Sequence, residues 1–357
     1  MGQTTAETTN VTGVTISVGF LGAGNIATYH SKSLRASGAD AVWAAVHDPD
    51  TERAERFGAA TDASVCDTPE EVVDRSDAVY VCTWTSEHER LVAMAADAGK
   101  AVFCEKPLGT NLAQAQRIVD TVERAGVINQ VGLVLRRSPV FHLLKDVANR
   151  PDSGKLLSFT FRDDQFLPIQ GRYASTWRAE VDKAGAGVLI EHSIHDIDLL
   201  EWMFGPIVSV SATTRYVHQI EGIEDSIAVN IGFESGLHGV MLSVWHDLLE
   251  RISNRDVEVF GTNLWARLRG EWFGDVTWTH GGQTFELTGQ ELLAEAARRS
   301  PGAGQNPDGE FIAAVAAGRP AYPSLRVALR AHQVVDACYR SAASGGARIE
   351  IPAAGAQ

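Results

Sequence analysis

The sequence predicts an α/β protein in two parts, a doubly wound parallel sheet followed by a second α/β domain rich in strands. A glycine-rich turn lies between the first predicted strand and the first predicted helix, and strands alternate with helices up to about residue 135. From residue 136, strand-like segments follow one another. The 357 residues suffice for two cores, which we place at 14–135 and 136–357 after a polar tail, residues 1–13, that we expect to be disordered.

The composition is that of an ordinary globular protein, with 45% hydrophobic and 21% charged residues. A net charge of -14 argues against nucleic acid or an anionic membrane as the partner. The first dozen residues lack the features of a signal peptide, and no apolar run is long enough to span a bilayer, so we expect a cytoplasmic protein. The four cysteines lack metal-ligand spacing and are interpreted as reduced core thiols.

The first strand, Val14 to Leu21, leads directly into the sequence Gly-Ala-Gly-Asn-Ile-Ala at 22–27. This is G-x-G-x-x-A between a strand and a helix, an arrangement that brings a pyrophosphate against the backbone amides of a helix N-terminus. Gly22 would allow the tight turn, Gly24 the close approach of phosphate, and Ala27 the close contact of helix and strand. The motif predicts dinucleotide binding.

A second strand, Ala41 to His47, ends at Asp48, about 20 residues beyond the glycines, where an acid is expected to hold the ribose hydroxyls. Asp48 is also a possible helix N-cap before Pro49, and the two roles are compatible. Its charge would repel the 2′-phosphate of NADP, Pro49 supplies no cation, and Asp50 adds negative charge. We therefore expect NAD rather than NADP.

The alternation continues with strands at 78–82, 100–104 and 127–135, and with helices that begin near 69, 87 and 111. In a parallel sheet, ligands bind at the carboxyl ends of the strands. Two such ends carry polar residues: one reads Thr-Trp-Thr-Ser-Glu-His at 83–88, the other Glu-Lys-Pro at 105–107.

Lys106 directly follows a buried strand, and Pro107 favours an extended backbone before it. Partial burial beside a cofactor would lower the pKa of this lysine and suit it to proton transfer. The alternative is a solvated lysine at the start of a loop.

The stretch from Ala184 to Gly205 is expected to be one helix with an apolar stripe at Ile190, Ile194, Ile197, Leu200 and Phe204. Glu191, His195 and Asp198 share another face, and His192 and Asp196 form a second i, i+4 pair. A carboxylate one turn before an imidazole orients it for proton transfer. A surface helix with two ordinary ion pairs is the competing interpretation.

Taken together, the glycine fingerprint, Glu-Lys-Pro after the fifth strand and small residues before an acid-x-x-x-His helix resemble the Gfo/Idh/MocA oxidoreductases, the relatives of glucose–fructose oxidoreductase and inositol dehydrogenase. The likeness extends from Val14 to about Ile351. It implies a Rossmann domain followed by an α/β domain with a large, open, mostly antiparallel sheet, which often forms the interface of a homodimer or homotetramer. It also implies hydride transfer between NAD(P) and a carbinol of a sugar, inositol or related polyol.

The resemblance implies a role for individual residues. The pyrophosphate loop would be Gly22, Gly24, Asn25 and Ile26, with Asp48 on the ribose. The nicotinamide side would be lined by Thr83, Trp84, His88 and Glu105. Lys106 and His195 match the catalytic lysine and histidine. Glu191 stands where many members have Asp, and its additional methylene places the carboxylate differently toward His195 or substrate. Trp84-Thr85 stand where Pro is common.

In the second part, alternating segments predict strands at 156–161, 207–215, 226–233, 237–245, 257–261, 264–268 and 276–280. The segment 162–178 is expected to be irregular, and it either closes over a polyol or packs against a neighbouring subunit. Arg136 reaches the same pocket or pairs with surface acids. Candidate substrate contacts are Arg136, Gln165, Tyr173, Trp177, Arg178 and His192.

Three alternatives stay open. The same fold with tightly held NAD could serve an NAD-dependent glycosidase that oxidises its substrate transiently. A non-catalytic sensor of NAD and sugar is a second, disfavoured by the presence of both Lys106 and His195. A zinc site at Glu191, His192 and His195 is a third, but three ligands on one helix face are difficult to supply, so no metal is expected.

Overall fold

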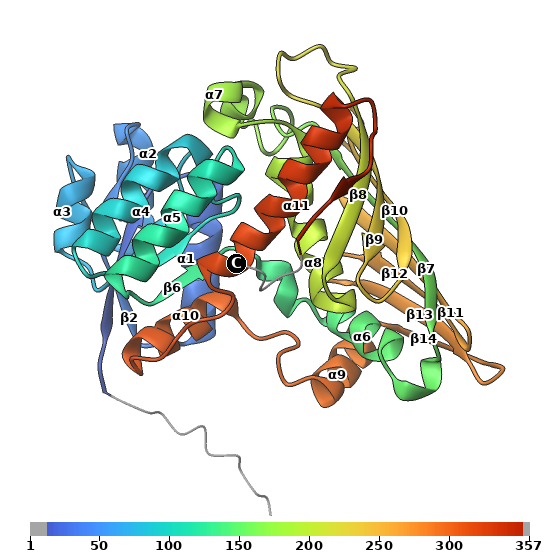
Figure 1. Cartoon of the computed structure of the whole chain (residues 1–357). Helices are drawn as coiled ribbons and strands as arrows, with labels where there is room; N and C mark the ends of the chain where they lie inside the picture. The colour runs from blue at the N-terminus through green and yellow to red at the C-terminus, as the bar shows by residue number, and fades with distance from the viewer. Residues whose placement is uncertain (1–12, 353–357) are drawn as a thin grey trace, which may run out of the picture.

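The computed structural model describes residues 13–352. Its first part is a parallel sheet in the strand order β3-β2-β1-β4-β5-β6 (Figure 1). The strands are β1 Ile16–Leu21, β2 Ala41–His47, β3 Ser64–Val65, β4 Ala78–Val81, β5 Ala101–Cys104 and β6 Asn129–Val131. The helices between them are α1 Asn25–Ser37, α2 Thr51–Thr61, α3 Pro69–Asp74, α4 His88–Asp97 and α5 Leu112–Ala125. The predicted Rossmann sheet is confirmed.

Two clusters of buried side chains belong to this sheet. One joins it to α3, α4 and α5, and the other joins it to α1 and α2. Its central strands β4 and β5 are fully buried along their length, as expected for parallel strands covered on both faces. Cys82 and Cys104 are free thiols within these clusters.

The second part is a nine-stranded sheet in the order β14-β13-β12-β11-β7-β10-β9-β8-β15. Neighbouring strands are antiparallel except β10 and β7, which run parallel, so the predicted mostly antiparallel sheet is confirmed. The strands are β7 Leu156–Phe166, β8 Ile207–Arg215, β9 Ser226–Phe233, β10 His238–His246, β11 Asn254–Gly261, β12 Leu264–Gly270, β13 Gly274–His280, β14 Gln283–Thr288 and β15 Ile349–Glu350.

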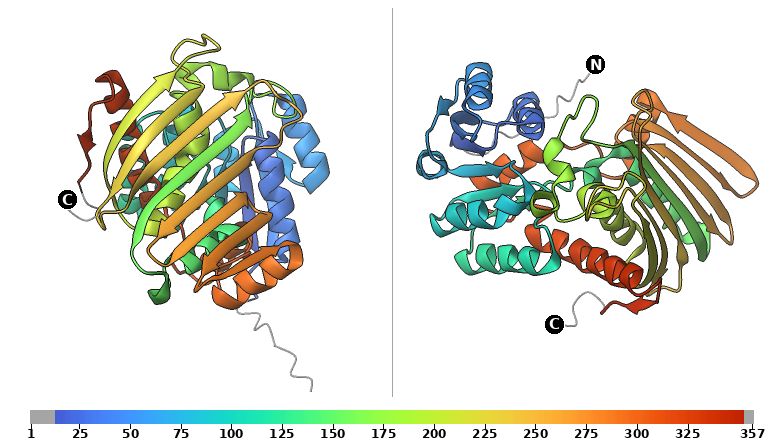
Figure 2. Two further views of the ribbon diagram at one scale, coloured as in Figure 1. Left: turned by 90° about the vertical axis from the view of Figure 1, so that its right-hand side faces the viewer. Right: turned by 90° about the horizontal axis from the view of Figure 1, so that it is seen from above.

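Helices cover only one face of this sheet (Figure 2). The longer helices that pack on it are α6 Pro139–Ala148, α8 Ile194–Phe204, α9 Gly289–Arg299 and α11 Leu325–Ala343. Helix α10 Pro307–Ala316 packs on the first sheet instead. The short turns of the chain are α7 Val181–Ala184, η1 Thr85–Glu87, η2 Val134–Arg137, η3 Pro151–Ser153, η4 Thr176–Ala179 and η5 Leu189–Ser193. Along β9, buried residues alternate with residues on the uncovered face.

The sequence prediction is wrong about the end of β7, which continues through 162–166 as strand. Asp163 and Asp164 interrupt its apolar pattern, but each carboxylate has a cation partner on the β11 side, Arg255 and Arg251 respectively. β14 and α6 were not predicted. β14 is largely exposed and therefore lacks an apolar alternation.

The chain returns to the first sheet near its C-terminal end. Phe311, Ile312 and Ala314 of α10 belong to the buried cluster beneath α1. Helix α11 then joins both parts, since Leu325 packs in the first and Val334 in the second. Residues that follow the predicted boundary at 135/136 therefore contribute to the cores of both parts.

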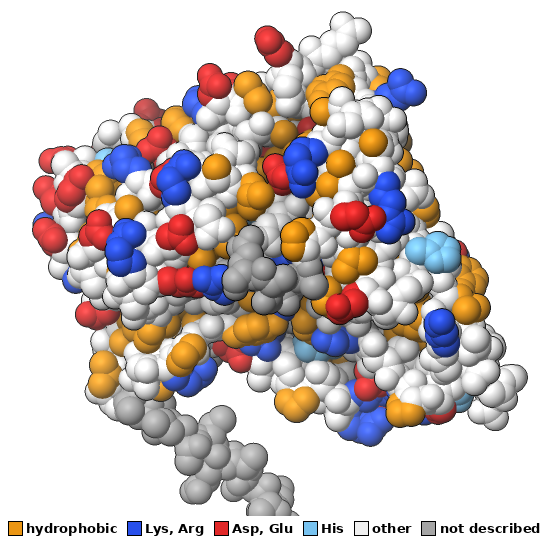
Figure 3. All heavy atoms as spheres, viewed as in Figure 1, with side chains coloured by type: hydrophobic (Ala, Val, Ile, Leu, Met, Phe, Trp, Pro, Cys, Tyr) orange, Lys and Arg blue, Asp and Glu red, His pale blue; other side chains and the backbone are white. Residues whose placement is uncertain are grey.

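Of the predicted tail 1–13, only Gly13 lies within the described residues. Among the helices of residues 13–352, none is long and apolar enough to cross a membrane. On the face shown in Figure 3, acidic side chains gather around α3 and the basic ones are scattered among them.

Candidate active site

The glycine-rich turn has the geometry that its sequence predicts. Gly22 adopts φ +92, and a Cβ there would lie 2.4 Å from the carbonyl oxygen of Cys82. Gly24 is the N-cap of α1, and a Cβ there would meet nothing within 4 Å. The open approach to the N-terminus of α1 fits a pyrophosphate.

Asn25 and Ile26 are exposed beside this opening. Asn25 donates a weak hydrogen bond from Nδ2 to the carbonyl oxygen of Tyr173, at 3.4 Å. A segment of the second part therefore reaches the predicted pyrophosphate loop.

Asp48 holds this loop from the end of β2. Its carboxylate accepts hydrogen bonds from the backbone N–H of Ala23, at 2.8 Å, and of Asp50, at 2.9 Å. The N-cap of α2 is Asp50, so the capping role considered for Asp48 is wrong. Arg53 lies beside both acids, 3.4 Å from Asp50 and 4.0 Å from Asp48.

Lys106 follows β5 and reaches the second part of the molecule. Its Nζ donates a hydrogen bond to the backbone oxygen of Glu191 at 2.7 Å. Burial lowers the pKa of this amine below its ordinary value, and the acids Glu191 and Glu105 oppose that shift. The predicted solvated alternative does not fit this half-buried, hydrogen-bonded lysine.

Glu105 does not line an open surface. Its carboxylate accepts hydrogen bonds from His30 Nε2, at 2.8 Å, and from the backbone N–H of Lys106, at 3.2 Å. Only 6% of the residue is exposed. This environment supports the Lys106 turn, and the nicotinamide contact of Glu105 stays a prediction.

The other predicted nicotinamide residues divide into exposed and buried ones. Trp84 is exposed and Thr83 half-buried, with the Lys183 amine 4.2 Å from the centre of the Trp84 ring. His88 is buried with its ring nitrogens 3.0 Å from the carbonyl oxygen of Pro107 and 3.4 Å from that of Thr83. Burial lowers the pKa of His88, and the neutral ring can donate to only one of these two carbonyl oxygens, of which that of Pro107 is the nearer.

The predicted single helix 184–205 is wrong at its start. Gly185 adopts φ +93, and the helix begins with a π-turn at 189–193 before α8. The Glu224 carboxylate accepts hydrogen bonds from the backbone N–H of Gly187, at 2.7 Å, and of Leu189, at 2.9 Å. The wider π-turn alters the helical spacing from which we paired Glu191 with His195.

Glu191 is buried, and its carboxylate has two partners. It accepts hydrogen bonds from Thr85 Oγ1, at 3.0 Å, and from Arg178 Nε, at 2.8 Å. The predicted orienting contact with His195 is replaced by these two. Glu191 thus joins the end of β4 to the segment that precedes α8.

His195 is half-buried at the start of α8. Burial lowers its pKa well below the ordinary value, and the charges of Lys106 and Arg255 lower it further. His195 is therefore neutral at neutral pH and can accept a proton.

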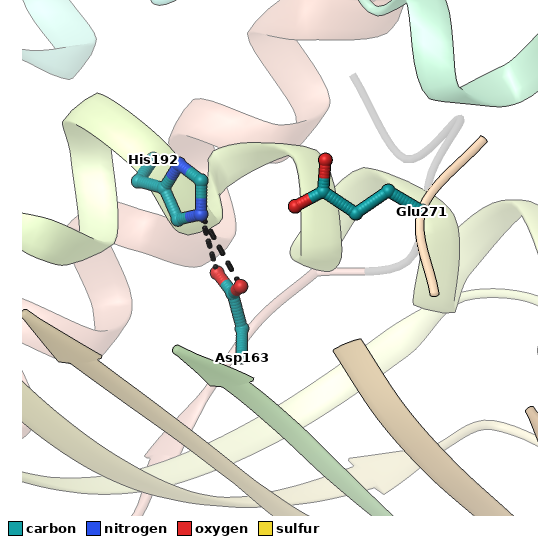
Figure 4. Close-up of side chains that lie close together, drawn as sticks. All are labelled: Asp163, His192 and Glu271. Atoms are coloured by element: carbon teal, nitrogen blue, oxygen red, sulfur yellow. Dashed lines mark hydrogen bonds and ion pairs between the residues drawn. The ribbon is translucent and has the colours of Figure 1, made fainter. Parts of the chain in front are cut away.

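Asp163 of β7 and His192 of the π-turn face each other, and Glu271 of the β12–β13 turn lies beside them (Figure 4). His192 Nε2 lies 3.0 Å from Asp163, so the predicted pairing of His192 with Asp196 is wrong. Asp196 instead accepts a hydrogen bond from Arg255 Nε at 2.5 Å.

Carboxylates and an imidazole at this spacing are possible metal ligands. Arg255, only 1% exposed, also lies 2.8 Å from Glu271 and 3.6 Å from Asp163. This buried guanidinium is already paired with all three acids, and its charge would repel a divalent ion. The group does not fit a metal, and neither does the zinc set, because Glu191 is bonded to Arg178.

The other residues predicted to contact the substrate lie in different surroundings. Arg136 donates two hydrogen bonds of 2.8 Å to Asp198, so it pairs with an acid as one of its two predicted roles had it, except that this acid is buried. Gln165 is buried in β7. Tyr173 stacks on Phe166 with ring centres 5.1 Å apart, and Arg178 stacks on Trp177 at 4.5 Å.

Sequence reasoning missed Thr85, Asp163 and Arg255. Thr85 stands within a strand-end loop that we singled out, and this position was a usable signal. Asp163 and Arg255 are adjacent only because β7 pairs with β11. Nothing local in the sequence indicates that register.

Two family descriptions match the chain. Residues 16–133 match the oxidoreductase family with an NAD-binding Rossmann fold, and residues 141–267 match the Gfo/Idh/MocA C-terminal domain. Inositol 2-dehydrogenase of Cereibacter sphaeroides is 31% identical over 62% of this chain and 67% of the relative. The scyllo-inositol 2-dehydrogenase (NAD(+)) of Bacillus subtilis is 32% identical over 61% and 64%.

Solved structures share the fold at lower identity. The WlbA dehydrogenase of Bordetella pertussis, in complex with NADH and UDP-GlcNAcA, has a TM-score of 0.83 at 22% identity and covers 96% of this chain and 100% of its own. Levoglucosan dehydrogenase with NADH and levoglucosan has a TM-score of 0.82 at 20% identity, with coverage of 95% and 100%. With two matching domains in the predicted order and a Rossmann turn built as its sequence predicts, the chain belongs to the Gfo/Idh/MocA family of oxidoreductases.

Proposed function

We propose that this protein transfers hydride between NAD and a carbinol of a sugar, inositol or related polyol. The observation that supports this most is the hydrogen bond from the Lys106 amine to the Glu191 backbone, one turn before His195. It brings an amine of lowered pKa and a neutral imidazole to the junction between the two parts of the molecule.

In the oxidative direction, hydride leaves the carbinol carbon for nicotinamide, and the hydroxyl proton goes to His195. Lys106 holds the reacting oxygen and helps to relay the proton. Glu191 keeps Arg178 and Thr85 in place around the substrate, a role that differs from the orienting of His195 that the sequence suggested. The bound cofactor supplies the redox chemistry, and these residues supply position and proton transfer.

We infer that NAD is preferred over NADP. Two backbone N–H groups donate hydrogen bonds to the Asp48 carboxylate, and these bonds hold the carboxylate in place at the end of β2. Arg53 is the nearby cation that could receive a 2′-phosphate, but it lies between Asp48 and Asp50 and its charge is balanced there. A higher kcat/KM with NADP than with NAD would contradict this inference.

We also infer a homodimer or homotetramer formed through the uncovered face of the nine-stranded sheet. Val240, Leu242 and Phe260 are 46%, 39% and 39% exposed on this face. Val240 and Leu242 lie two residues apart on β10, so both side chains point to this uncovered face.

The test is a panel of inositols, aldoses and their keto forms, each supplied with NAD or NADP and the corresponding reduced cofactor. We expect cofactor reduction or oxidation with at least one polyol and its loss in Lys106→Met. Hydrolysis of a glycoside without net NADH formation would replace this proposal by the glycosidase alternative. Binding of NAD and sugar without turnover of any kind would favour the sensor.

A further inference from the structure

A buried histidine connects helix α10 to Glu105, the residue before Lys106. His30 of α1 is completely buried, with Nδ1 2.8 Å from Asp308 of α10 and Nε2 2.8 Å from Glu105. Ionised carboxylates only accept hydrogen bonds, so a ring with a carboxylate on each nitrogen must donate from both. His30 is therefore an imidazolium.

The surroundings of His30 maintain this charge. Burial alone would lower its pKa, but the charges and hydrogen bonds of Asp308 and Glu105 raise it to about 10. The Phe103 ring lies 4.8 Å from the imidazole and separates it from water. The other titratable groups around this cluster include phenols and thiols with raised pKa values, namely Tyr29, Tyr80, Cys82 and Cys104. The charge of Glu105 also acts on Lys106 and His88, and burial lowers the pKa of both.

Glu105 transmits the position of His30 to the Lys106 turn. One carboxylate oxygen accepts the hydrogen bond of His30 and the other accepts the backbone N–H of Lys106, at 3.2 Å. Gly132 packs so closely that a Cβ there would lie 2.1 Å from the same carboxylate, which leaves Glu105 little room to move. The Lys106 side chain in turn bonds to Glu191.

We propose that His30 is a positioning residue, which as an imidazolium between Asp308 and Glu105 fixes the Lys106 turn and so places the reactive amine. The proposal rests on the proposed role of Lys106 in hydride transfer. When His30 loses its proton, one ring nitrogen becomes an acceptor that faces a carboxylate, and that contact changes from attraction to repulsion. Without the hydrogen bond from His30, Glu105 would hold the turn less firmly, and the Lys106 amine would no longer keep its position relative to His195.

The test uses Asp308→Asn, which keeps the shape and an acceptor oxygen but removes one charge. We expect the alkaline pH at which kcat falls to move down by about one to two units, as loss of a neighbouring opposite charge predicts. The KM for NAD should stay within about twofold at pH 7, where His30 is still protonated. His30→Gln, which has no charge to lose, should have a low kcat without this added pH dependence.

Ser33→Ala is the matched control, because Ser33 Oγ donates a hydrogen bond to Asn306 at the same α1–α10 junction, at 3.3 Å, whereas the His30 ring is bonded to Asp308 and Glu105. It should leave the pH profile of kcat unchanged. If the profiles of Asp308→Asn and wild type coincide up to pH 10, the proposal is overturned, and a shift in Ser33→Ala equal to that in Asp308→Asn would also overturn it.

A second readout needs no substrate. The rate at which an amine-reactive reagent labels Lys106, followed by peptide mass spectrometry, should rise in Asp308→Asn above pH 8 and not in Ser33→Ala. Should no polyol be turned over by the wild type, the proposed function fails while this labelling still decides the role of His30. Equal labelling rates in all three proteins would contradict it.

Discussion

At the scale of single residues, the Lys106 amine carries the strongest prediction. Replacing Lys106 by Met keeps most of the side-chain volume and removes the charge and the donors, so kcat should fall on the order of a hundredfold or more with NAD binding little changed. Steady-state kinetics measure kcat, and an NADH fluorescence titration measures cofactor binding. Lys145→Met is the control, since that lysine stacks on Trp202 of the second part at 4.1 Å. Near-normal turnover in Lys106→Met would contradict the site.

Buried Glu191 and half-buried Arg178 form an ion pair, and a double-mutant cycle measures the coupling energy between them. Glu191→Gln and Arg178→Met each remove the ion pair, so the double variant should lose less than the sum of the singles, with a coupling of about 1 kcal/mol or more in kcat/KM. Glu191→Gln alone should be milder than Lys106→Met, because its carboxylate positions neighbours. Strict additivity of the two substitutions would show that the pair does not act as a unit.

Residues whose chemistry depends on local sequence were predictable. Gly22 needs its positive φ, Asp48 ends a strand, and Lys106 precedes a proline, and each lies where we placed it. The partners of Glu191 and His192 were not predictable, because Arg178 and Asp163 reach them through chain folding. Helical spacing paired these side chains with residues on their own helix, and in the structure both are bonded to other segments.

At the scale of elements, the two glycines of the turn have different roles: Gly22 is needed for the fold and for NAD binding, and Gly24 for NAD binding alone. Gly22→Ala places a Cβ 2.4 Å from a backbone oxygen in a left-handed conformation, so both stability and NAD affinity should fall. Gly24→Ala meets nothing in the protein, so its melting temperature should stay within a few degrees while the Kd for NAD rises about tenfold or more. Thermal unfolding and NADH titration of both variants check this. Unchanged affinity in Gly24→Ala would argue against phosphate approach at that residue.

Elements with a clear period were predicted almost to the residue, as β2, β8 and β9 show. The π-turn was not, because its cause lies in Glu224, which binds two backbone N–H groups from a distant loop. The prediction ended β7 too early because two consecutive aspartates are typical of a loop, although in β7 they are buried. Both errors come from polar groups whose partners are remote in sequence.

At the scale of the whole molecule, stability should depend on the charge of His30. Its pKa of about 10 in the folded protein exceeds the ordinary value of 6.5, so its contribution is complete below pH 6.5 and is lost as pH rises through about 10. The urea midpoint of the wild type should therefore fall between pH 7 and pH 10 by more than that of His30→Gln. Parallel pH dependences of the two proteins would contradict a buried imidazolium.

The uncovered sheet face predicts association. Leu242→Glu introduces a charge at the middle of β10 on this face and should convert an oligomer into a species of 38.5 kDa without changing the melting temperature of the isolated chain by much. Light scattering at micromolar concentration measures this, with Val65→Glu as a control on the exposed two-residue strand β3 of the first sheet. A wild type that is already monomeric would exclude the interface.

The return of α10 to the first sheet sets an order of events during synthesis on the ribosome. His30 and Asp308 are 278 positions apart, which at about 5–20 residues per second corresponds to roughly 15–55 seconds of elongation. Throughout this interval the emerging first domain lacks Phe311 and Ile312 from its core and the second carboxylate for its buried histidine. The nascent domain therefore remains unfinished until α10 has been synthesised, and a chain truncated before α10 should be a substrate for chaperones and proteases.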